Sequence, residues 1–309
     1  MNTPSNVMAE SPSRSEAVAP VEIPAARRLA WSMRRELWEN RSIYVAPLAV
    51  AAIFLAGFLI GLIGLPDRMR AALALGPMEQ REAIEQPYVI AAIMLMAIAL
   101  IIAVVYCLDA FYGERRDRSI LFWKSLPVSD LTTVLSKASI PILVIPLVTF
   151  AVTVATQLIM LLASSAVLAG SGISPGTLWA HVPFFKTSLI NFGHLVVYHG
   201  IWYAPFYGWL LMVSAWANRA PFLWATLPPI AIGVVERMTF NSSHFAAMVR
   251  YRFMGDPEPL AAAGGMTMDM LGSHSPGEFL TSPGLWFGLA VTAAFLFAAV
   301  RLRRHRGPI

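Results

Sequence analysis

The amino-acid sequence predicts an all-α polytopic membrane protein with six transmembrane helices, an N-terminal interfacial helix and a short helix in one cytoplasmic loop. Two observations lead to this fold class. Of the 309 residues, 57% are apolar and only 13% are charged, whereas a soluble domain carries roughly 25% charged residues. Several uncharged stretches also reach the length of about 20 residues that a helix needs to cross a bilayer. So little charge could not cover a water-soluble protein of this size, which excludes a soluble enzyme.

The N-terminal part divides into a tail and an amphipathic segment. Residues 1–24 are rich in Pro, Ser, Ala and Glu and predict a disordered cytoplasmic tail. Residues 25–309 then form one transmembrane domain. Its first segment, residues 27–40, is basic and carries Trp31 and Trp38, which predicts a helix in the membrane interface. Attraction to anionic lipid and docking of a partner protein are equally good explanations of this helix.

Six uncharged stretches predict the membrane spans. The third stretch is long enough for two crossings, but the Gly/Pro-rich residues 170–176 interrupt it. The fifth is short and extends past Glu236. We place the spans at about residues 43–65, 87–109, 138–168, 188–217, 220–240 and 281–300.

The distribution of basic residues predicts the orientation of the chain. With six spans and the N-terminus in the cytoplasm, 16 of the 23 Lys and Arg residues fall on the cytoplasmic side, as the positive-inside rule requires. Both termini are therefore expected in the cytoplasm, and the location is a cell membrane, such as a bacterial plasma membrane. On the outer side, residues 67–85 favour helix, and residues 241–283 predict a surface helix followed by a loop.

The cytoplasmic loop between the second and third predicted spans has an unusual composition. It begins with charged residues, continues through the apolar run Ile120–Trp123, and ends at Ser129, which can cap a helix starting at Asp130. A free loop would not expose so many apolar side chains to water. They need a membrane interface or a partner to cover them, and composition alone slightly favours the lipid interface.

This loop resembles that of the permease subunits of type-2 ABC exporters. The resemblance rests on the Glu114-Arg115 pair, on Ser119-Ile120-Leu121 and on Lys124-Ser-Leu-Pro-Val-Ser129. It covers residues 112–137 in motif and residues 25–309 in architecture. It implies a coupling helix that sits in a cleft of a separate ABC ATPase subunit, with the contact or positioning residues Glu114, Arg115, Ser119, Ile120, Phe122, Lys124, Pro127 and Ser129.

The same resemblance implies the remaining partners. The helix at residues 27–40 corresponds to the family's elbow helix, and a second permease subunit pairs with this one as a homodimer or heterodimer. ATP and Mg would bind to the ATPase subunit, and this chain would bind no cofactor. The sequence agrees on one point independently of the family: none of its three lysines follows a glycine, so it has no Gly-x-x-x-x-Gly-Lys-Ser/Thr phosphate loop and is not expected to be an enzyme.

Other candidate sites lie within the spans. Thr153 and Gln157 in the third span, Tyr198, Trp202 and Phe206 in the fourth and Glu236 in the fifth are candidates for lining a transport pathway, although aromatic rows more often form the core. His194 and His199 do not share a helix face, and Cys107 is the only cysteine, so we expect no metal site. Nucleic acid is not an expected partner.

Two other functions remain open. An intramembrane carboxylate marks functional sites, and Glu236 could therefore serve a proton-coupled secondary transporter, although a structural ion pair is slightly favoured. The chain could also be a membrane scaffold that transports nothing.

Overall fold

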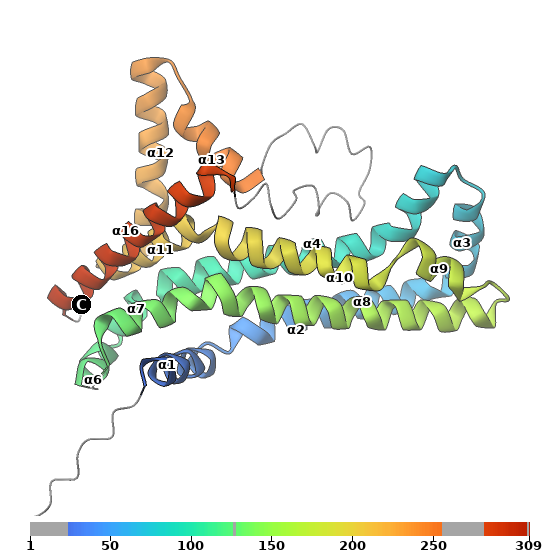
Figure 1. Ribbon diagram of the computed structural model, residues 1–309, viewed down its shortest axis with the longest axis horizontal. Helices are drawn as coiled ribbons and strands as arrows, with labels where there is room; N and C mark the ends of the chain where they lie inside the picture. The colour runs from blue at the N-terminus through green and yellow to red at the C-terminus, as the bar shows by residue number, and fades with distance from the viewer. Residues whose placement is uncertain (1–23, 126–127, 255–280, 308) are drawn as a thin grey trace, which may run out of the picture.

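The computed structural model describes residues 24–125, 128–254, 281–307 and 309, and within these ranges every regular element is a helix. The helices form an elongated bundle (Figure 1). One end of the bundle, called here the α6 end, gathers α1 (Ala25–Glu39), α6 (Ser119–Ser125) and the C-terminal end of α16 (Pro283–His305). The opposite end, called the α3 end, holds α3 (Leu65–Leu73) and α9 (Pro175–His181).

Four described helices are long and apolar enough to cross a membrane, which identifies a membrane-embedded all-α protein. They coincide with the first, second, third and sixth predicted spans, and they run over Ser42–Leu73, Pro77–Arg116, Asp130–Gly170 and Pro283–His305. The first contains α2 (Ser42–Gly61), a 3-10 turn η1 (Leu62–Gly64) and α3; the second contains α4 (Pro77–Asp109) and α5 (Tyr112–Arg116). The third contains α7 (Asp130–Ser139), a π-helical turn η2 (Ile140–Val144) and α8 (Ile145–Gly170).

The predicted span at residues 188–217 is an interrupted helix. It consists of α10 (Phe184–Gly193), a π-helical segment η3 (His194–Trp202) and α11 (Ala204–Trp216). Pro205 stands in the first turn of α11, where its missing N–H would be unpaired in any case. The break before it therefore follows from the proline, and no single long apolar helix forms here.

The predicted span at residues 220–240 is the helix α12 (Pro221–Phe240), which projects away from the bundle (Figure 1). It contains Pro228 and Pro229, and it ends with Glu236 and Arg237 in its last turns. These residues reduce its hydropathy, so it is not among the four helices that meet the length and composition of a span.

Two segments on the predicted outer side are helical in the structure. The helix α4, which contains the predicted span at residues 87–109, begins at Pro77, because its charged first turns continue the helix beyond the apolar stretch. The outer segment 67–85 consequently consists of α3 and the start of α4. The surface helix expected after Ser242 is α13 (His244–Met254), and the loop predicted to follow it lies mostly outside the described residues.

Two large hydrophobic clusters hold the bundle together. At the α6 end, buried side chains of α2, α4, α7, α11 and α16 pack together, among them Ile43, Tyr106, Val134, Tyr207, Leu211 and Ala299. Toward the α3 end, Met69, Tyr88, Met160, Leu161 and Leu178 form the second cluster. The outer faces are also apolar, with Ile53, Ile60, Ile101 and Leu162 exposed, as expected of helices that face lipid.

Candidate functional site

The short helix α6 follows α5 after a tight turn at the α6 end. Arg118 takes a left-handed conformation there, with φ of 59°, a region that few residues other than glycine adopt. After α6 the chain enters α7, whose N-cap is Ser129: its Oγ accepts a hydrogen bond of 3.1 Å from the backbone N–H of Thr132. This confirms the cap predicted from the sequence.

The apolar side chains of α6 divide between two directions. Ile120 is buried against the bundle, whereas Leu121 and Phe122 are each 59% exposed. Trp123 lies beside Phe122, with 4.8 Å between the ring centroids, and the Arg35 guanidinium of α1 lies 3.9 Å from the Trp123 ring centroid. The helix is thus anchored on one side and presents apolar surface on the other.

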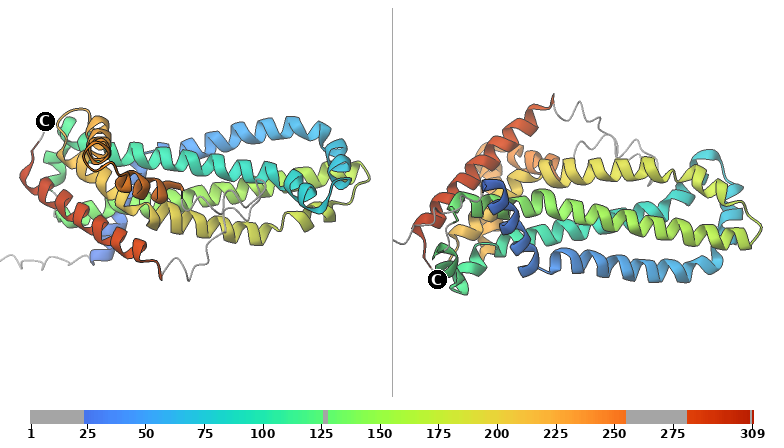
Figure 2. Two further views of the ribbon diagram at one scale, coloured as in Figure 1. Left: turned by 90° about the horizontal axis from the view of Figure 1, so that it is seen from above. Right: turned by 60° about the horizontal axis from the view of Figure 1, so that its bottom comes forward.

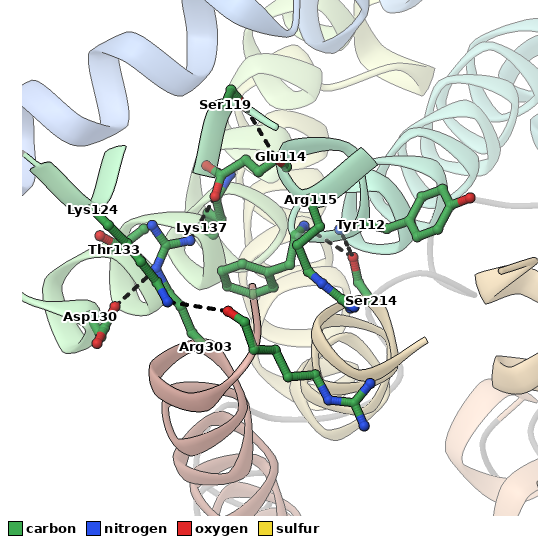
Figure 3. Close-up of polar contacts among 12 residues, drawn as sticks. Tyr112, Glu114, Arg115, Ser119, Lys124, Asp130, Thr133, Lys137, Ser214 and Arg303 are labelled. Carbon is green, nitrogen blue, oxygen red and sulfur yellow. Dashed lines mark hydrogen bonds and ion pairs between the residues drawn. The ribbon is translucent and has the colours of Figure 1, made fainter. Parts of the chain in front are cut away.

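A carboxylate of α5 lies at the centre of a buried group of charges beneath α6 (Figure 3). Glu114 accepts a 2.6 Å hydrogen bond from Nη1 of Arg303 in α16 and lies 3.2 Å from Nζ of Lys137 in α7. Its Oε1 is also 3.6 Å from Nη2 of Arg35. Arg303 in turn contacts Asp130, at 3.1 Å.

A second carboxylate, Glu36 of α1, completes this group. It lies 3.0 Å from Nζ of Lys137 and 2.6 Å from Nη2 of Arg35, and it accepts a 2.9 Å hydrogen bond from the Tyr106 hydroxyl. Burial opposes its ionisation, but the charges of Lys137 and Arg35 outweigh that effect and hold the pKa of Glu36 below its ordinary value of 4.5. We call Glu36, Glu114, Asp130, Lys137 and Arg303 the charge network; it joins α1, α5, α7 and α16.

The partner of Glu114 in the motif, Arg115, has a different role. Its guanidinium donates hydrogen bonds to the carbonyl oxygens of Ala215 and Ala217, at 2.9 and 3.0 Å, and to Oδ1 of Asn218 at 2.7 Å. These carbonyls belong to the C-terminal end of α11, where helical acceptors lack internal partners. Nearby, Oγ of Ser214 accepts hydrogen bonds from the backbone N–H groups of Phe111 and Tyr112, both at 3.0 Å (Figure 3). The start of the loop is therefore fixed to α11.

Most of the predicted coupling residues come together in this region, but they face different ways. Lys124 donates a 3.2 Å hydrogen bond to the carbonyl of Arg306, and the Ser119 hydroxyl donates a 3.4 Å bond to the carbonyl of Glu114. Arg115 and Ile120 are buried, the Glu114 side chain is 9% exposed, and Phe122 is directed outward. Pro127 lies outside the described residues.

Four members of the charge network were not among the candidates predicted from the sequence: Glu36, Asp130, Lys137 and Arg303. Glu36 falls on the same arc of α1 as Leu29, Met33 and Leu37, and an acid on the apolar arc of a helix is the signal that could have identified it. Lys137 and Arg303 lie near the ends of apolar stretches, where a basic residue is ordinarily assigned to the membrane surface.

The candidate pathway residues of the third span lie inside the bundle. Nε2 of Gln157 donates to the carbonyl of Tyr88 at 3.1 Å, and its Oε1 accepts from Nδ2 of Asn191 at the same distance. The Thr153 hydroxyl donates a 2.8 Å hydrogen bond to the carbonyl of Thr149 in its own helix. These contacts join α4, α8 and α10 through buried polar groups.

The other pathway candidates lie elsewhere. Nε1 of Trp202 donates to the carbonyl of Arg252 in α13 at 2.8 Å, and Phe206 meets Phe253 with 5.0 Å between ring centroids. The side chain of Tyr198 is outside the described part of the chain. Trp202 and Phe206 therefore contact α13, whereas Gln157 contacts α4 and α10.

Glu236 lies in the last turns of α12, and its carboxylate reaches the turn between α12 and α13. Its carboxylate accepts hydrogen bonds from Oγ of Ser242 at 2.8 Å and from the backbone N–H groups of His244 and Phe245 at 2.7 and 2.9 Å. A carboxylate in this position satisfies the free N–H groups at the start of α13 and interacts favourably with the helix dipole. The geometry thus assigns Glu236 a capping role.

Comparisons with known proteins add no family to these observations: no protein-family model, no curated protein and no solved structure matches the chain.

Proposed function

We propose that this chain is the permease subunit of an ABC exporter, which moves a substrate out of the cytoplasm when a separate ATPase subunit docks on α6. ATP and Mg would bind to that ATPase, since the chain lacks a phosphate loop. In this proposal the α6 end is cytoplasmic and α1 is the elbow helix. The α10–η3–α11 segment and α12 supply the fourth and fifth of six spans in a bacterial plasma membrane.

The observation that carries the proposal is the combination of an exposed apolar surface and a rigid base on α6. Leu121 and Phe122 are more than half exposed, while Ile120 is buried and Trp123 is covered by Arg35. Exposed apolar groups on a short, firmly held helix are typical of a docking surface.

The charge network supports a mechanical role for this docking surface. A force on α6 and α5 reaches Glu114, which contacts Lys137 of α7 and Arg303 of α16 directly. Both of these helices belong to membrane-spanning segments. ATP binding in the partner would therefore change the relative positions of two spans. These ion pairs are buried, so salt screens them much less than it screens exposed pairs.

A second permease subunit is also part of the proposal, as homodimer or heterodimer. The support for it is α12, which exposes Trp224, Leu227, Ile230 and Val234 and buries only Ala225 against the rest of the chain. A helix this apolar requires lipid or another subunit on most of its surface.

The rival function, a proton-coupled secondary transporter that uses Glu236, receives less support. The Glu236 carboxylate accepts three hydrogen bonds at the start of α13. A carboxylate engaged in this way is stabilised as an anion, which does not favour cycles of protonation during transport.

The experiment that tests the proposal is co-purification. The full-length tagged chain is isolated from its own membranes, and a co-purifying protein with a phosphate-loop motif and ATPase activity is expected. Phe122→Ala should reduce the amount of bound ATPase at least tenfold, because a central aromatic anchor of an interface contributes about 2 kcal/mol or more.

Phe185→Ala is the matched control, since Phe185 is an equally simple truncation of an exposed phenylalanine, 86% exposed, in α10. It should leave the bound ATPase unchanged. Absence of any ATPase from the wild-type preparation, or equal capture by Phe122→Ala and wild type, would reject the exporter function.

A further inference from the structure

The outward face of α1 carries an alternating row of arginine and tryptophan. Arg27, Trp31, Arg34 and Trp38 are spaced four, three and four residues apart, which places them within about 60° of one another around the helix. Trp31 is 53% exposed and Trp38 is 69% exposed. The guanidinium of Arg27 lies 5.6 Å from the Trp31 ring centroid, and that of Arg34 lies 5.0 Å from the Trp38 ring centroid. We call these four residues the Arg-Trp row.

The charge of this face is entirely positive. The two acidic residues of α1 are directed elsewhere: Glu36 is buried in the charge network, and Glu39 pairs with Arg35 at 3.5 Å. Arg28 is exposed beside the row. The face therefore combines cations with large amphipathic rings, and within the described residues of α1 it contains no carboxylate to neutralise them.

The position of α1 indicates what this face meets. The helix ends at Glu39, and α2, the first membrane-spanning helix, begins at Ser42. Figure 2 shows α1 running across the long axis of the bundle, whereas α2 runs along it. Because the spans cross the bilayer, a helix perpendicular to them and joined to one of them by two residues lies along the membrane surface.

We propose that the Arg-Trp row binds the headgroups of anionic phospholipids and that this binding fixes the position of α6. Guanidinium groups pair well with phosphate oxygens, and tryptophan rings settle at the boundary between headgroups and acyl chains. A purely positive face beside a membrane span complements an anionic lipid surface.

The link to α6 runs through two other residues of the same helix, Arg35 beside the row and Glu36 on the opposite face. Arg35 lies over Trp123 of α6 at 3.9 Å and contacts Glu114 at 3.6 Å, while Glu36 holds Lys137. A shift of α1 relative to the membrane therefore moves the groups that hold α6. In the proposed exporter this would make ATPase docking sensitive to lipid charge, a consequence that rests on the proposed function. Lipid binding and the response of α6 do not depend on it.

The first measurement is the affinity for lipid. The full-length chain in neutral detergent is titrated with phosphatidylglycerol, and bound lipid is counted by native mass spectrometry. Each arginine near an anionic surface contributes about fivefold in affinity, so Arg27→Gln/Arg34→Gln should weaken phosphatidylglycerol binding by roughly 25-fold. Arg237→Gln/Arg250→Gln, which removes two exposed arginines from α12 and α13, is the matched control and should bind as wild type does.

The second measurement uses the unmodified chain in nanodiscs of phosphatidylcholine alone or of phosphatidylcholine mixed with phosphatidylglycerol. Hydrogen exchange of α1 and α6 should slow in the mixed lipid, and α9, at the far end, should not change. In Arg27→Gln/Arg34→Gln the slowing should disappear from both helices. No ATPase is present in either measurement, so failure to find one leaves the result interpretable.

Several outcomes would overturn the inference. Equal phosphatidylglycerol affinity of Arg27→Gln/Arg34→Gln and the control pair would show that the row is not the lipid site. Slower exchange in α1 without any change in α6 would show that lipid binding is not transmitted. Hydrogen exchange of α1 that is the same in both nanodiscs would show that the row does not bind anionic lipid, which leaves the face to a protein partner.

Discussion

Among single residues, Glu36 is held by several charged and polar partners. It is buried, and its carboxylate meets Lys137, Arg35 and the Tyr106 hydroxyl. Removing one partner from a buried ion pair costs about 3–5 kcal/mol, because the remaining charge is left without compensation. Here Lys137 keeps Glu114 as a neighbour, so the cost falls at the lower end of that range.

We therefore predict that Glu36→Gln lowers the free energy of unfolding by about 3 kcal/mol, measured by denaturant or thermal unfolding in detergent. Because the pKa of Glu36 is lowered on folding, its stabilisation is complete above its ordinary pKa of 4.5 and is lost as pH falls through the lower folded pKa. Wild-type stability should thus decline below about pH 4.5, and Glu36→Gln should decline less.

Glu39→Gln is the control for this prediction. Glu39 is 43% exposed and its contact with Arg35 is a surface ion pair, worth at most about 1 kcal/mol. Its substitution should change stability little at neutral pH. If both variants unfolded alike, the charge network would not be a stabilising element.

Arg115 gives a second residue-level prediction, one that depends on geometry more than on charge. Its planar guanidinium reaches Ala215, Ala217 and Asn218 together, and a lysine ammonium cannot reproduce that fork. Arg115→Lys should lower the free energy of unfolding by about 2 kcal/mol, seen as a lower thermal midpoint. Arg116→Lys should have almost no effect, since Arg116 is exposed and its contacts are with the nearby residues Asp117 and Tyr112.

Among the helices, the two π-helical segments η2 and η3 come so close at Gly200 that there is no room for a side chain between them. A Cβ added to Gly200 in η3 would lie 2.5 Å from the carbonyl oxygen of Ile142 in η2, which is well inside van der Waals contact. The contact atom belongs to the backbone, so it cannot move aside without displacing the segment. Glycine is required here because of this packing.

Gly200→Ala should therefore lower the thermal midpoint, with a cost of about 1–3 kcal/mol for overpacking. Gly193→Ala is the matched control, because nothing lies within 4 Å of a Cβ at that position in α10. It should leave stability unchanged or raise it by up to about 1 kcal/mol, since alanine favours helix over glycine. An equal loss in both variants would indicate that helix propensity and not the close approach controls the site.

The helices also show which features could be predicted from the sequence. Uncharged length located α2, α4, α8 and α16, since a membrane helix must be long and apolar, and Ser129 could be identified as a cap from its place before Asp130. The π-helical turn at η3 and the direction of α12 could not be predicted, because both depend on packing between segments distant in sequence. Glu114 could be identified from a local sequence motif. Its partners Lys137 and Arg303 could not, because they meet it only when helices distant in sequence pack together.

For the whole molecule, the number of crossings determines on which side of the membrane the turn between α12 and α13 lies. In the six-span proposal this turn is outside, on the side opposite to α6. If α12 does not cross, the turn is on the same side as α6. Ser243 is exposed in this turn, and Cys107, the only native cysteine, is buried. A single introduced cysteine can therefore be labelled without background labelling of Cys107.

We predict that Ser243→Cys is labelled by a membrane-impermeant maleimide added outside intact cells, and that Arg118→Cys, in the turn before α6, is labelled only after the membrane is opened. Gly76→Cys, between α3 and α4, serves as the external reference. Labelling of Ser243→Cys only in opened cells would place α12 on the cytoplasmic side and reject six spans.

The helical run Asp130–Gly170 is long enough that a small tilt at one end produces a large displacement at the other. Its 41 residues extend about 60 Å at 1.5 Å per residue, roughly twice the hydrocarbon thickness of a bilayer. The run is anchored at one end by Lys137, and the π-helical turn η2, between Ile140 and Val144, lies close to that anchor. The 26 residues of α8 beyond it form an arm about 39 Å long. A tilt of about 10° at η2 would therefore carry the far tip of α8 through roughly 7 Å, so that a small angular change at one membrane surface becomes a displacement larger than a water molecule at the other.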